Sequence, residues 1–462
     1  MGVVINKQRA EAIKQIDLIE VTGAGAGSDT ITMTVNLKDV VVTIGTGTTT
    51  AQIAQSIMDA LNASTRIDGT GSNTNTSNVG GQEFGEFSEF TAVIYSTSNT
   101  IVRLIANQAG VPFTLSVAKT GTVTFTHTAS SQAATGPEWW NNGDNWNGGN
   151  APVTGDHIIL AESSIGFKYG LPTNLQIRNE ALEIHKSFIG WLGLPPINRT
   201  NAGKPYNEYR PRYPVFYDGD GITARNPFFE IGRGVGLGSP LLNIEYDAQH
   251  VDATSTWRIF DTGTPQPNII SPYALHIATD GTSDNNDFFF MKGYAVLGYE
   301  PDGKSATITN VSVGHSGSQP SDVSLLLDDM QGGAGISVTQ NGGIVTYAGV
   351  SSTITLWELN NGTMNYIGSA AITAADLYVG QLFIIGNPTI TTLTIGQRAI
   401  ADFNRGTESL TITNLDMHAG AHFLDDNDRV AVTNGPDLIR CGMEDVVIRR
   451  GKHLRVTKGA VS

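Results

Sequence analysis

The chain has 462 residues, a formal net charge of −15 and a single cysteine. Charged residues make up only 15% of it while glycine alone numbers 53, a composition typical of an all-β protein with many turns and not of a helical enzyme. The acidic balance argues against nucleic-acid binding, because phosphate contacts need a basic face. Cys441 stands alone, so no intrachain disulfide can form.

Residues 1–16 are predicted to form an N-terminal arm with a short helix over 3–16. Ile5, Ile13 and Ile16 fall at helical spacing on one face, and we expect that face to contact a partner. Charged residues interrupt this stretch, so we expect no export signal, and no run approaches the ~18 apolar residues of a membrane span. The prediction is synthesis in a cytoplasm without membrane insertion.

Residues 17–127 predict a small α+β domain. The helix Ala51–Asn62 has Ile53, Ile57 and Leu61 at helical spacing, and Thr50 is its predicted cap. Runs of β-branched and aromatic residues predict strands at Ile16–Val21, Thr30–Val35, Val40–Ile44, Phe90–Tyr95, Ile101–Ala106, Phe113–Val117 and Val123–Thr126.

A phenylalanine recurs every third residue over 83–90, a period that fits neither a strand nor a helix. Two interpretations stay open: an extended arm that inserts Phe84 and Phe87 into a partner, or packing within the small domain. Residues 128–138 follow as a predicted linker, because small and polar residues there end in Gly and Pro.

Trp139, Trp140 and Trp146 lie among glycines and asparagines just before a predicted strand at His157–Leu160. Large aromatic side chains suit the first coil of a solenoid, where the open end of a core must be covered. Strands at Leu241–Tyr246, Thr256–Phe260 and Leu275–Ala278 follow at uneven spacing. We therefore expect residues 139–300 to form an irregular β region with long aromatic loops.

From residue 301 to 462, short β-type runs recur every ~17–21 residues, with turn-forming residues between them. A strand and a corner in each repeat predict a β-solenoid, which buries each coil on the next and forms a stiff rod. The predicted fold is mainly β, with the small α+β domain ahead of this solenoid. The runs are Ile308–Val313, Ile336–Val338, Ile354–Trp357, Ala375–Val379, Ile390–Ile395, Ser409–Thr413, Arg429–Val432 and Val446–Arg449.

Two polar clusters near the C-terminus are candidate sites. Asp416, His418 and His422 are a weak candidate for a divalent metal, but Gly420 is expected to bend the chain between the histidines, which favours a solvated corner. We therefore expect no metal or other cofactor. Arg449 and Arg450 belong to a basic stretch that either closes the last coil or contacts an acidic partner.

Residues 191–230 combine aromatic and acidic side chains. Such a mixture suits core packing, a wet protein interface or a sugar-binding cleft, and with two well-placed carboxylates it also suits glycan hydrolysis. We expect no enzymatic activity, because no catalytic signature accompanies it. The candidate glycan-binding residues are Trp191, Tyr206, Tyr209, Tyr213 and Tyr217, beside Glu208, Asp218, Asp220 and Glu230.

Three segments resemble known virion proteins. The pattern from Trp140 through Asn145, Trp146 and Pro152 to Asp156 resembles the opening motif of β-helical proteins of bacterial surfaces and tailed phages. Residues 29–57 are similar to small β-rich modules of phage virion proteins, and residues 193–213 also resemble such proteins. The resemblance implies a virion component and transfers no catalytic residue.

Two functions from different classes follow from these features. The first is a homotrimeric capsid decoration (cement) protein that contacts the major capsid protein or other virion proteins. The alternative is a tail fibre or tailspike that binds, or binds and cleaves, a host surface polysaccharide. A bacterial adhesin is third, since we expect no export signal.

Overall fold

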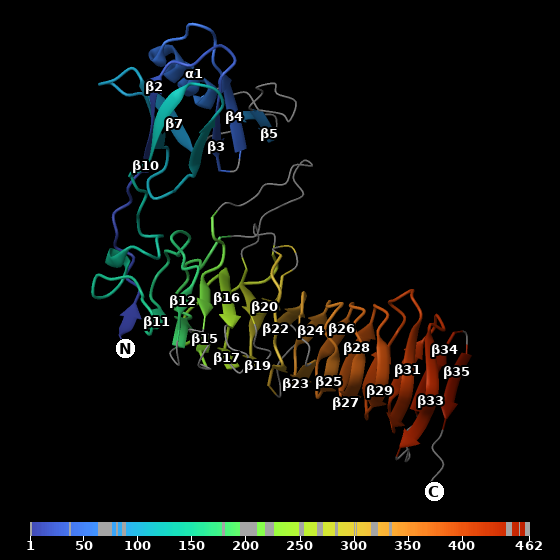
Figure 1. Ribbon diagram of the computed structural model, residues 1–462. Coiled ribbons are helices and arrows are strands. Elements are labelled where there is room, and N and C mark those ends of the chain that lie inside the picture. The colour runs from blue at the N-terminus through green and yellow to red at the C-terminus, as the bar shows by residue number, and fades with distance from the viewer. Residues whose placement is uncertain are drawn as a thin grey trace.

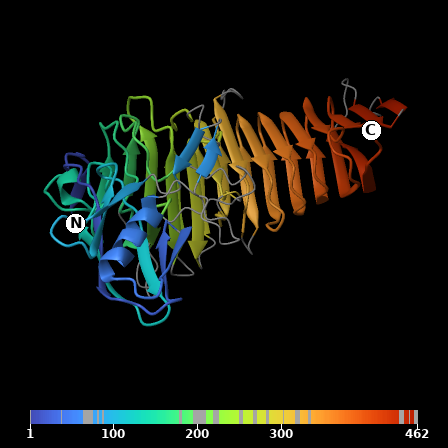
Figure 2. The ribbon, with the colours of Figure 1, turned by 90° about the horizontal axis from the view of Figure 1, so that it is seen from above.

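The computed structural model has two parts, a small α+β domain and a long parallel β-solenoid that extends away from it (Figure 1). The N-terminus lies at the first coils and the C-terminus at the far end, and the view from above shows the small domain beside the first coils (Figure 2). The structure describes residues 2–36, 38–62, 76–79, 82–85, 89–177, 181–194, 210–217, 226–248, 254–265, 271–281, 285–299, 301, 303–315, 322–331, 335–439, 446–451 and 453–457.

The solenoid consists of two sheets of 13 strands, and successive strands of the chain alternate between them. Every neighbouring pair in the first sheet is parallel. This first sheet contains β1 (Val3–Ile5), β11 (His157–Leu160), β13 (Ala181–His185), β15 (Phe228–Arg233), β17 (Thr254–Ile259), β19 (Asn285–Phe290), β21 (Asn310–Val313), β23 (Ile336–Gln340), β25 (Ile354–Leu359), β27 (Ile372–Leu377), β29 (Thr389–Ile395), β31 (Leu410–His418) and β33 (Val430–Ile439).

The second sheet is also parallel, except that its last two strands form an antiparallel hairpin at the C-terminal end. It contains β12 (Leu175–Gln176), β14 (Val215–Tyr217), β16 (Leu242–Ala248), β18 (Leu275–Gly281), β20 (Gly293–Leu297), β22 (Val323–Leu327), β24 (Ile344–Tyr347), β26 (Thr363–Tyr366), β28 (Gly380–Ile384), β30 (Ala399–Asp402), β32 (His422–Asp425), β34 (Val446–Arg450) and β35 (His453–Thr457).

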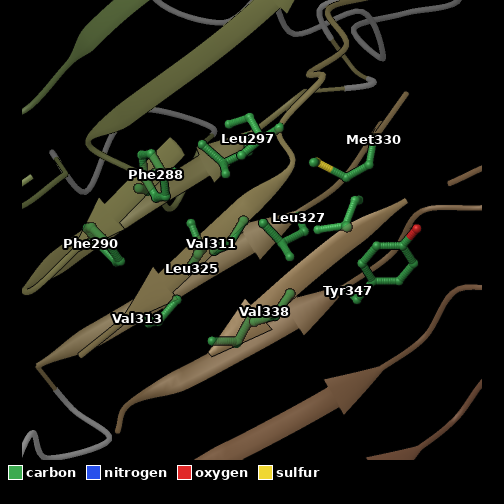
Figure 3. Close-up of a cluster of buried hydrophobic side chains, with 14 of the residues drawn as sticks. Phe288, Phe290, Leu297, Val311, Val313, Leu325, Leu327, Met330, Val338 and Tyr347 are labelled. Carbon is green, nitrogen blue, oxygen red and sulfur yellow. The ribbon is translucent and has the colours of Figure 1, made fainter. Parts of the chain in front are cut away.

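One continuous hydrophobic core lies between the two sheets. Side chains alternate between core and exterior along most strands, although β25, β27 and β29 each have two outward residues in a row, and the inward ones repeat at the same register from coil to coil. Ile354 pairs with Ile372, and Ile372 pairs with Ile390. Figure 3 shows this packing in the middle of the rod, where Phe288 and Phe290 of β19 and Leu325 and Leu327 of β22 lie in the same layer of buried side chains.

The predicted C-terminal repeat is confirmed, but its runs correspond to only one of the two strands of each coil. Seven of the predicted runs overlap first-sheet strands β21 to β33, and the run at Val446 overlaps β34. The second strand of a later coil can be only four residues long, as in Thr363–Tyr366, where Thr363 and Asn365 are polar. The expected start at residue 301 is wrong, because β11 to β20 already belong to the same two sheets.

Stacked glycines form the corners of the later coils. Gly362 has φ +103°, and a Cβ atom there would lie 2.4 Å from the carbonyl oxygen of Gly343 in the preceding coil. Only glycine allows both this backbone angle and this close approach. The two columns consist of Gly343, Gly362 and Gly380, and of Gly349, Gly368 and Gly386.

Residues 3–16 do not form the predicted helix. Val4 pairs with Ile158, which makes β1 the first strand of the solenoid, and Ile16 begins a strand of the small domain. Three consecutive β-branched residues at 3–5 favour a strand, and pairing with β11 decides in its favour. Ile16 is buried, so its expected role on a partner is wrong as well.

The first coil is closed by aromatic side chains, as the sequence predicts. Trp140 and Trp146 are buried against Phe167, whose ring stacks on that of Trp146 with centroids 4.8 Å apart. The short 3-10 turn Gly143–Asn145 precedes Trp146, and the open edge of β1 is paired with Asn147, whose N–H donates to the Ile5 carbonyl at 2.9 Å. A covered edge protects the parallel sheet from further strand pairing.

The small domain is α+β, as expected, and its helix α1 (Thr50–Asn62) buries Ile53, Ala54, Ile57 and Leu61. The cap is Thr49 and not Thr50: its Oγ1 accepts from the Gln52 N–H at 3.3 Å, and its own N–H donates to the Gln52 side chain. The antiparallel sheets contain β10 (Thr124–Gln132), β2 (Ile16–Gly23), β8 (Ile101–Ala106) and β7 (Phe90–Ile94); β4 (Lys38–Thr43), β3 (Thr30–Val35) and β9 (Leu115–Lys119); and β5 (Thr76–Val79) and β6 (Gln82–Gly85).

The predicted linker starts too early. Strand β10 continues through Gln132, which pairs with Ile16 of β2, so residues 128–132 belong to the small domain. Two chain segments then connect the domain to the solenoid, one before β2 and one after β10. They pair through a bridge between Ile13 and Thr135.

The outer face of the second sheet is buried near β16 and β18. Asn243 and Glu245 point away from the core, yet both are buried, because other chain segments cover them. The Asn243 side-chain amide donates to the Leu194 carbonyl at 2.8 Å, and the Lys304 ammonium lies 2.5 Å from the Glu245 carboxylate. This extra layer positions the residues of the candidate site.

Candidate functional site

Aromatic rings and cationic side chains alternate on the surface of the first coils. Parallel bridges join Trp139 to Tyr169 and Phe167 to Leu192, which stacks these segments at coil spacing. Phe167 and Leu192 point into the core, so their neighbours Lys168 and Trp191 face outward. The aromatic–cationic surface consists of Trp139, Lys168, Trp191 and Arg210, and the buried ring of Tyr169 contacts Trp139 and Arg210.

Cation–π contacts connect this surface. The Lys168 ammonium lies 5.3 Å from the ring centroid of Trp191, and the Arg210 guanidinium lies 5.6 Å from that of Tyr169. The ring of Tyr169 is 5.6 Å from that of Trp139. Lys168 also forms an ion pair with Glu138 at 2.5 Å, which holds its ammonium beside the Trp191 ring.

A pocket of about 270 Å³ adjoins this surface. Lys304 lies there between the Glu245 carboxylate and the ring of Tyr213, at 5.5 Å from the ring centroid. Three cationic side chains and one carboxylate line it, so its local charge is opposite to that of the whole chain. The lining residues are Thr173, Arg210, Pro211, Arg212, Tyr213, Val215, Glu245 and Lys304.

A larger, uncharged pocket of about 620 Å³ lies where the small domain meets the solenoid. Trp139 lines it and also donates its indole N–H to the Gly110 carbonyl of the small domain at 2.7 Å. Gln15 and Asn142 contribute amides to the wall, and both are held by internal hydrogen bonds. Trp139 thus lines this pocket and also packs against Tyr169, which contacts Arg210 in the wall of the smaller pocket.

The structure brings together part of the predicted glycan site. The Leu194 N–H donates to the Arg212 carbonyl at 3.2 Å, which holds the segments of Trp191 and Tyr213 side by side. Tyr213 is buried, whereas Tyr217 is half-buried on β14. Tyr206 and Tyr209 lie outside the described residues.

Of the four predicted acids, only Glu230 lies among the described residues, so no carboxylate pair can be assigned there. Glu230 is buried on β15 in the first sheet and bonds Arg233 at 3.1 Å, whereas Tyr217 lies in the second sheet. Glu208, Asp218 and Asp220 lie outside the described residues, as do Phe87 and the side chain of Phe84.

Lys168, Tyr169, Arg210 and Lys304 were missed by sequence reasoning. The alternation of Phe167, Lys168 and Tyr169 is a strand-like signal that marks Lys168 as outward-facing. These side chains come together only because segments far apart in the chain stack in neighbouring coils.

The weak metal candidate is divided between the two sheets. Asp416 and His418 lie on β31 of the first sheet, whereas His422 lies on β32 of the second. Gly420, with φ +76°, forms the turn between the strands, as the sequence predicts. Among the residues that the structure describes, no group of three or more His, Cys, Asp or Glu side chains could hold a metal ion.

Arg449 and Arg450 are engaged within the last coils. The Arg449 guanidinium donates two hydrogen bonds to Asp426, and Arg450 pairs with Asp428 at 3.1 Å. Both arginines remain about two-fifths exposed. Of the two interpretations of this basic stretch, these contacts favour a polar cap.

No protein-family model matches the chain, and a search of curated proteins returns no match. In the described part of the chain, no helix has the length and apolar character needed to cross a membrane.

Proposed function

We propose that the protein is a structural component of a tailed-bacteriophage virion, a homotrimeric capsid decoration protein that contacts the major capsid protein. The observation that carries this proposal is the single hydrophobic core that runs through all coils of the solenoid, with a small domain at one end. Such a rod resists bending because each coil is hydrogen-bonded to the next. The small domain is then the part suited to attachment.

The outer face of the first sheet supports a role in a packed assembly. Thr355, Thr373 and Thr391 are exposed at the same register in successive coils. This row of threonines can approach another protein without the desolvation cost of buried charge, whereas the neighbouring row on the same face carries Glu358 and Asp376. The resemblance of the segment around Trp140 and Trp146, now seen as the closed first coil, to phage β-helical proteins agrees with this role.

A tail fibre or tailspike that binds a polysaccharide is the second candidate. The aromatic–cationic surface favours it, because flat rings stack on sugar rings and cations attract acidic sugars. Long stacks of coils also present extended surfaces suited to polymers.

Imaging of particles that carry a labelled copy of the protein tests the proposal. Label over the whole shell supports the decoration role, label only at the tail supports the second candidate, and particles without label contradict both. Binding of host polysaccharide provides a further test of the tail role. Under that role, Trp191→Ala should weaken binding at least tenfold, whereas Tyr378→Ala, which removes an exposed ring far along the rod, should not.

A further inference from the structure

Five asparagines of this chain directly precede a glycine, and the structure describes all five pairs. In such a pair the main-chain nitrogen of the glycine can attack the asparagine side-chain amide, because no Cβ atom on the glycine obstructs the approach. The side chain must also lie against that nitrogen, so the fold decides which pair reacts. The five are Asn142, Asn147, Asn341, Asn361 and Asn434.

Four of these side chains are held by hydrogen bonds to residues other than the following glycine. The Asn341 Oδ1 accepts the Asn360 side-chain amide of the next coil at 3.0 Å, and the Asn147 Oδ1 accepts the Ile5 N–H at 2.7 Å. Each of the four must give up such a bond before its amide carbon can meet the glycine nitrogen. The other two bonds join Asn142 to the Asp144 N–H at 2.9 Å and Asn434 to the Asn414 side chain at 3.0 Å.

Asn361 instead turns its side chain onto its own next residue. Its Oδ1 accepts the Gly362 N–H at 2.8 Å, which brings the Gly362 nitrogen beside the Cγ atom that carries this oxygen. Both residues lie in the corner between β25 and β26, and Asn361 is exposed. Water and hydroxide therefore have access to the corner where the Gly362 nitrogen must lose its proton before it attacks.

We propose that Asn361 is a site of spontaneous deamidation. The deprotonated Gly362 nitrogen forms a bond to Asn361 Cγ, and the side-chain amide nitrogen takes up a proton and leaves as ammonia. One water molecule then opens the resulting cyclic imide at either of its two carbonyl carbons, which gives aspartate or isoaspartate. One water is consumed and one ammonia is released, with no change of oxidation state.

The products change this corner in two ways. A carboxylate replaces a neutral amide, which adds one negative charge to a chain that already carries −15. In isoaspartate the main chain also runs through Cβ and Cγ, which inserts one carbon atom directly before Gly362. A Cβ atom on Gly362 would lie only 2.4 Å from the Gly343 carbonyl oxygen of the preceding coil, so the longer chain must displace this packed corner.

Peptide mapping by mass spectrometry of the full chain, incubated at mildly alkaline pH, compares conversion at the five pairs. In the folded protein we expect Asn361 to convert at least about tenfold faster than Asn341, because about 1 Å of misplacement can cost about a hundredfold in rate. In denaturant the five rates should become similar. Equal rates in the folded protein would overturn the proposal, and so would a preference for Asn361 that persists in denaturant.

Asn360→Ala is the matched variant, since this exposed residue supplies the amide that holds Asn341. Asn341 should convert several-fold faster in the variant, with an unaltered circular dichroism spectrum. An unchanged rate at Asn341 would contradict the argument that hydrogen bonds protect the other pairs. Asn361→Gln must close a larger ring, so it should lose the first acidic species that ion exchange resolves in the unchanged protein. Persistence of that species would place the reaction elsewhere.

Discussion

Tyr347 and Tyr366 stack in successive coils of the second sheet, with ring centroids 4.9 Å apart and an interplanar angle of 18°. Each hydroxyl donates to a backbone carbonyl near the adjoining corner, Tyr347 to Ser352 and Tyr366 to Ala370. Burial raises the pKa of both hydroxyls above the ordinary value of 10.0, and Tyr347 raises that of Tyr366 further. The pair links strand stacking to corner geometry.

We predict that the solenoid loses stability above about pH 10, because the unfolded tyrosines then release protons that the folded ones retain. Tyr366→Phe should lower the free energy of unfolding at neutral pH by about 1–3 kcal/mol, since the Ala370 carbonyl loses its donor. The variant should also show a shallower alkaline decline. Denaturant titrations across the pH range measure both effects. Tyr378→Phe, at an exposed position, is the control, and the same alkaline slope in all three proteins would contradict the prediction.

The small domain should be sensitive to acid through Asp29. Burial raises the pKa of this carboxyl, but hydrogen bonds from the N–H groups of Val123, Thr122 and Ala26 and from the Thr122 hydroxyl lower it below 3.8 overall. Its stabilising contribution is therefore complete above about pH 4 and lost as the pH falls through the lower folded pKa.

Asp29→Asn should thus lower the melting temperature of the small domain at neutral pH and flatten its decline in acid. Calorimetry with hydrogen exchange of the β3 and β10 amides assigns the transition to this domain. The control Asp59→Asn removes a carboxylate that accepts a bond from the Gln55 side chain on the exposed face of α1, and should have little effect. An Asp29→Asn variant with an unchanged melting temperature would show that these hydrogen bonds do not hold the turn.

Gly362→Ala should destabilise the solenoid by about 3 kcal/mol or more, because it adds a clash with the Gly343 carbonyl to the strain of a positive φ. Gly148→Ala serves as the matched control, since φ there is +86° and no atom lies within 4 Å of the added Cβ. Denaturant unfolding compares the two. Equal losses would mean that backbone strain alone, and not coil stacking, requires the glycine.

Substitutions at adjacent residues of β1 test whether this segment is a strand of the core or a helical arm. Val4 is buried in the first coil and Val3 is 55% exposed, so Val4→Ser should cost about 1–3 kcal/mol and Val3→Ser less than about 0.5 kcal/mol. The midpoint of thermal unfolding, followed by tryptophan fluorescence of the first coil, measures this difference. Similar effects of both changes would contradict the assignment of β1 to the core.

Local patterns in the sequence determined the helix α1 and the first-sheet strands of the later coils. Ile53, Ile57 and Leu61 fall on one helical face, and Ile354, Ile372 and Ile390 recur with regular turns between them. These signals depend on residues close in the chain, where backbone geometry fixes which side chains share a face. The position of Trp140 and Trp146 over the open end of the core could also be predicted, because two large rings beside glycines suit such a site.

The tertiary structure alone decided where the solenoid begins and which residues form the candidate site. Val4 becomes a strand residue through its pairing with Ile158, a partner that spacing within 1–16 does not reveal. Trp139, Lys168 and Arg210 come together because coils of unequal length stack at one constant spacing, so sequence distance between residues no longer indicates their distance in space. Hydrogen bonds between coils, which join residues far apart in the chain, set that stacking, and the short-range periodicity of the sequence does not indicate which residues they join.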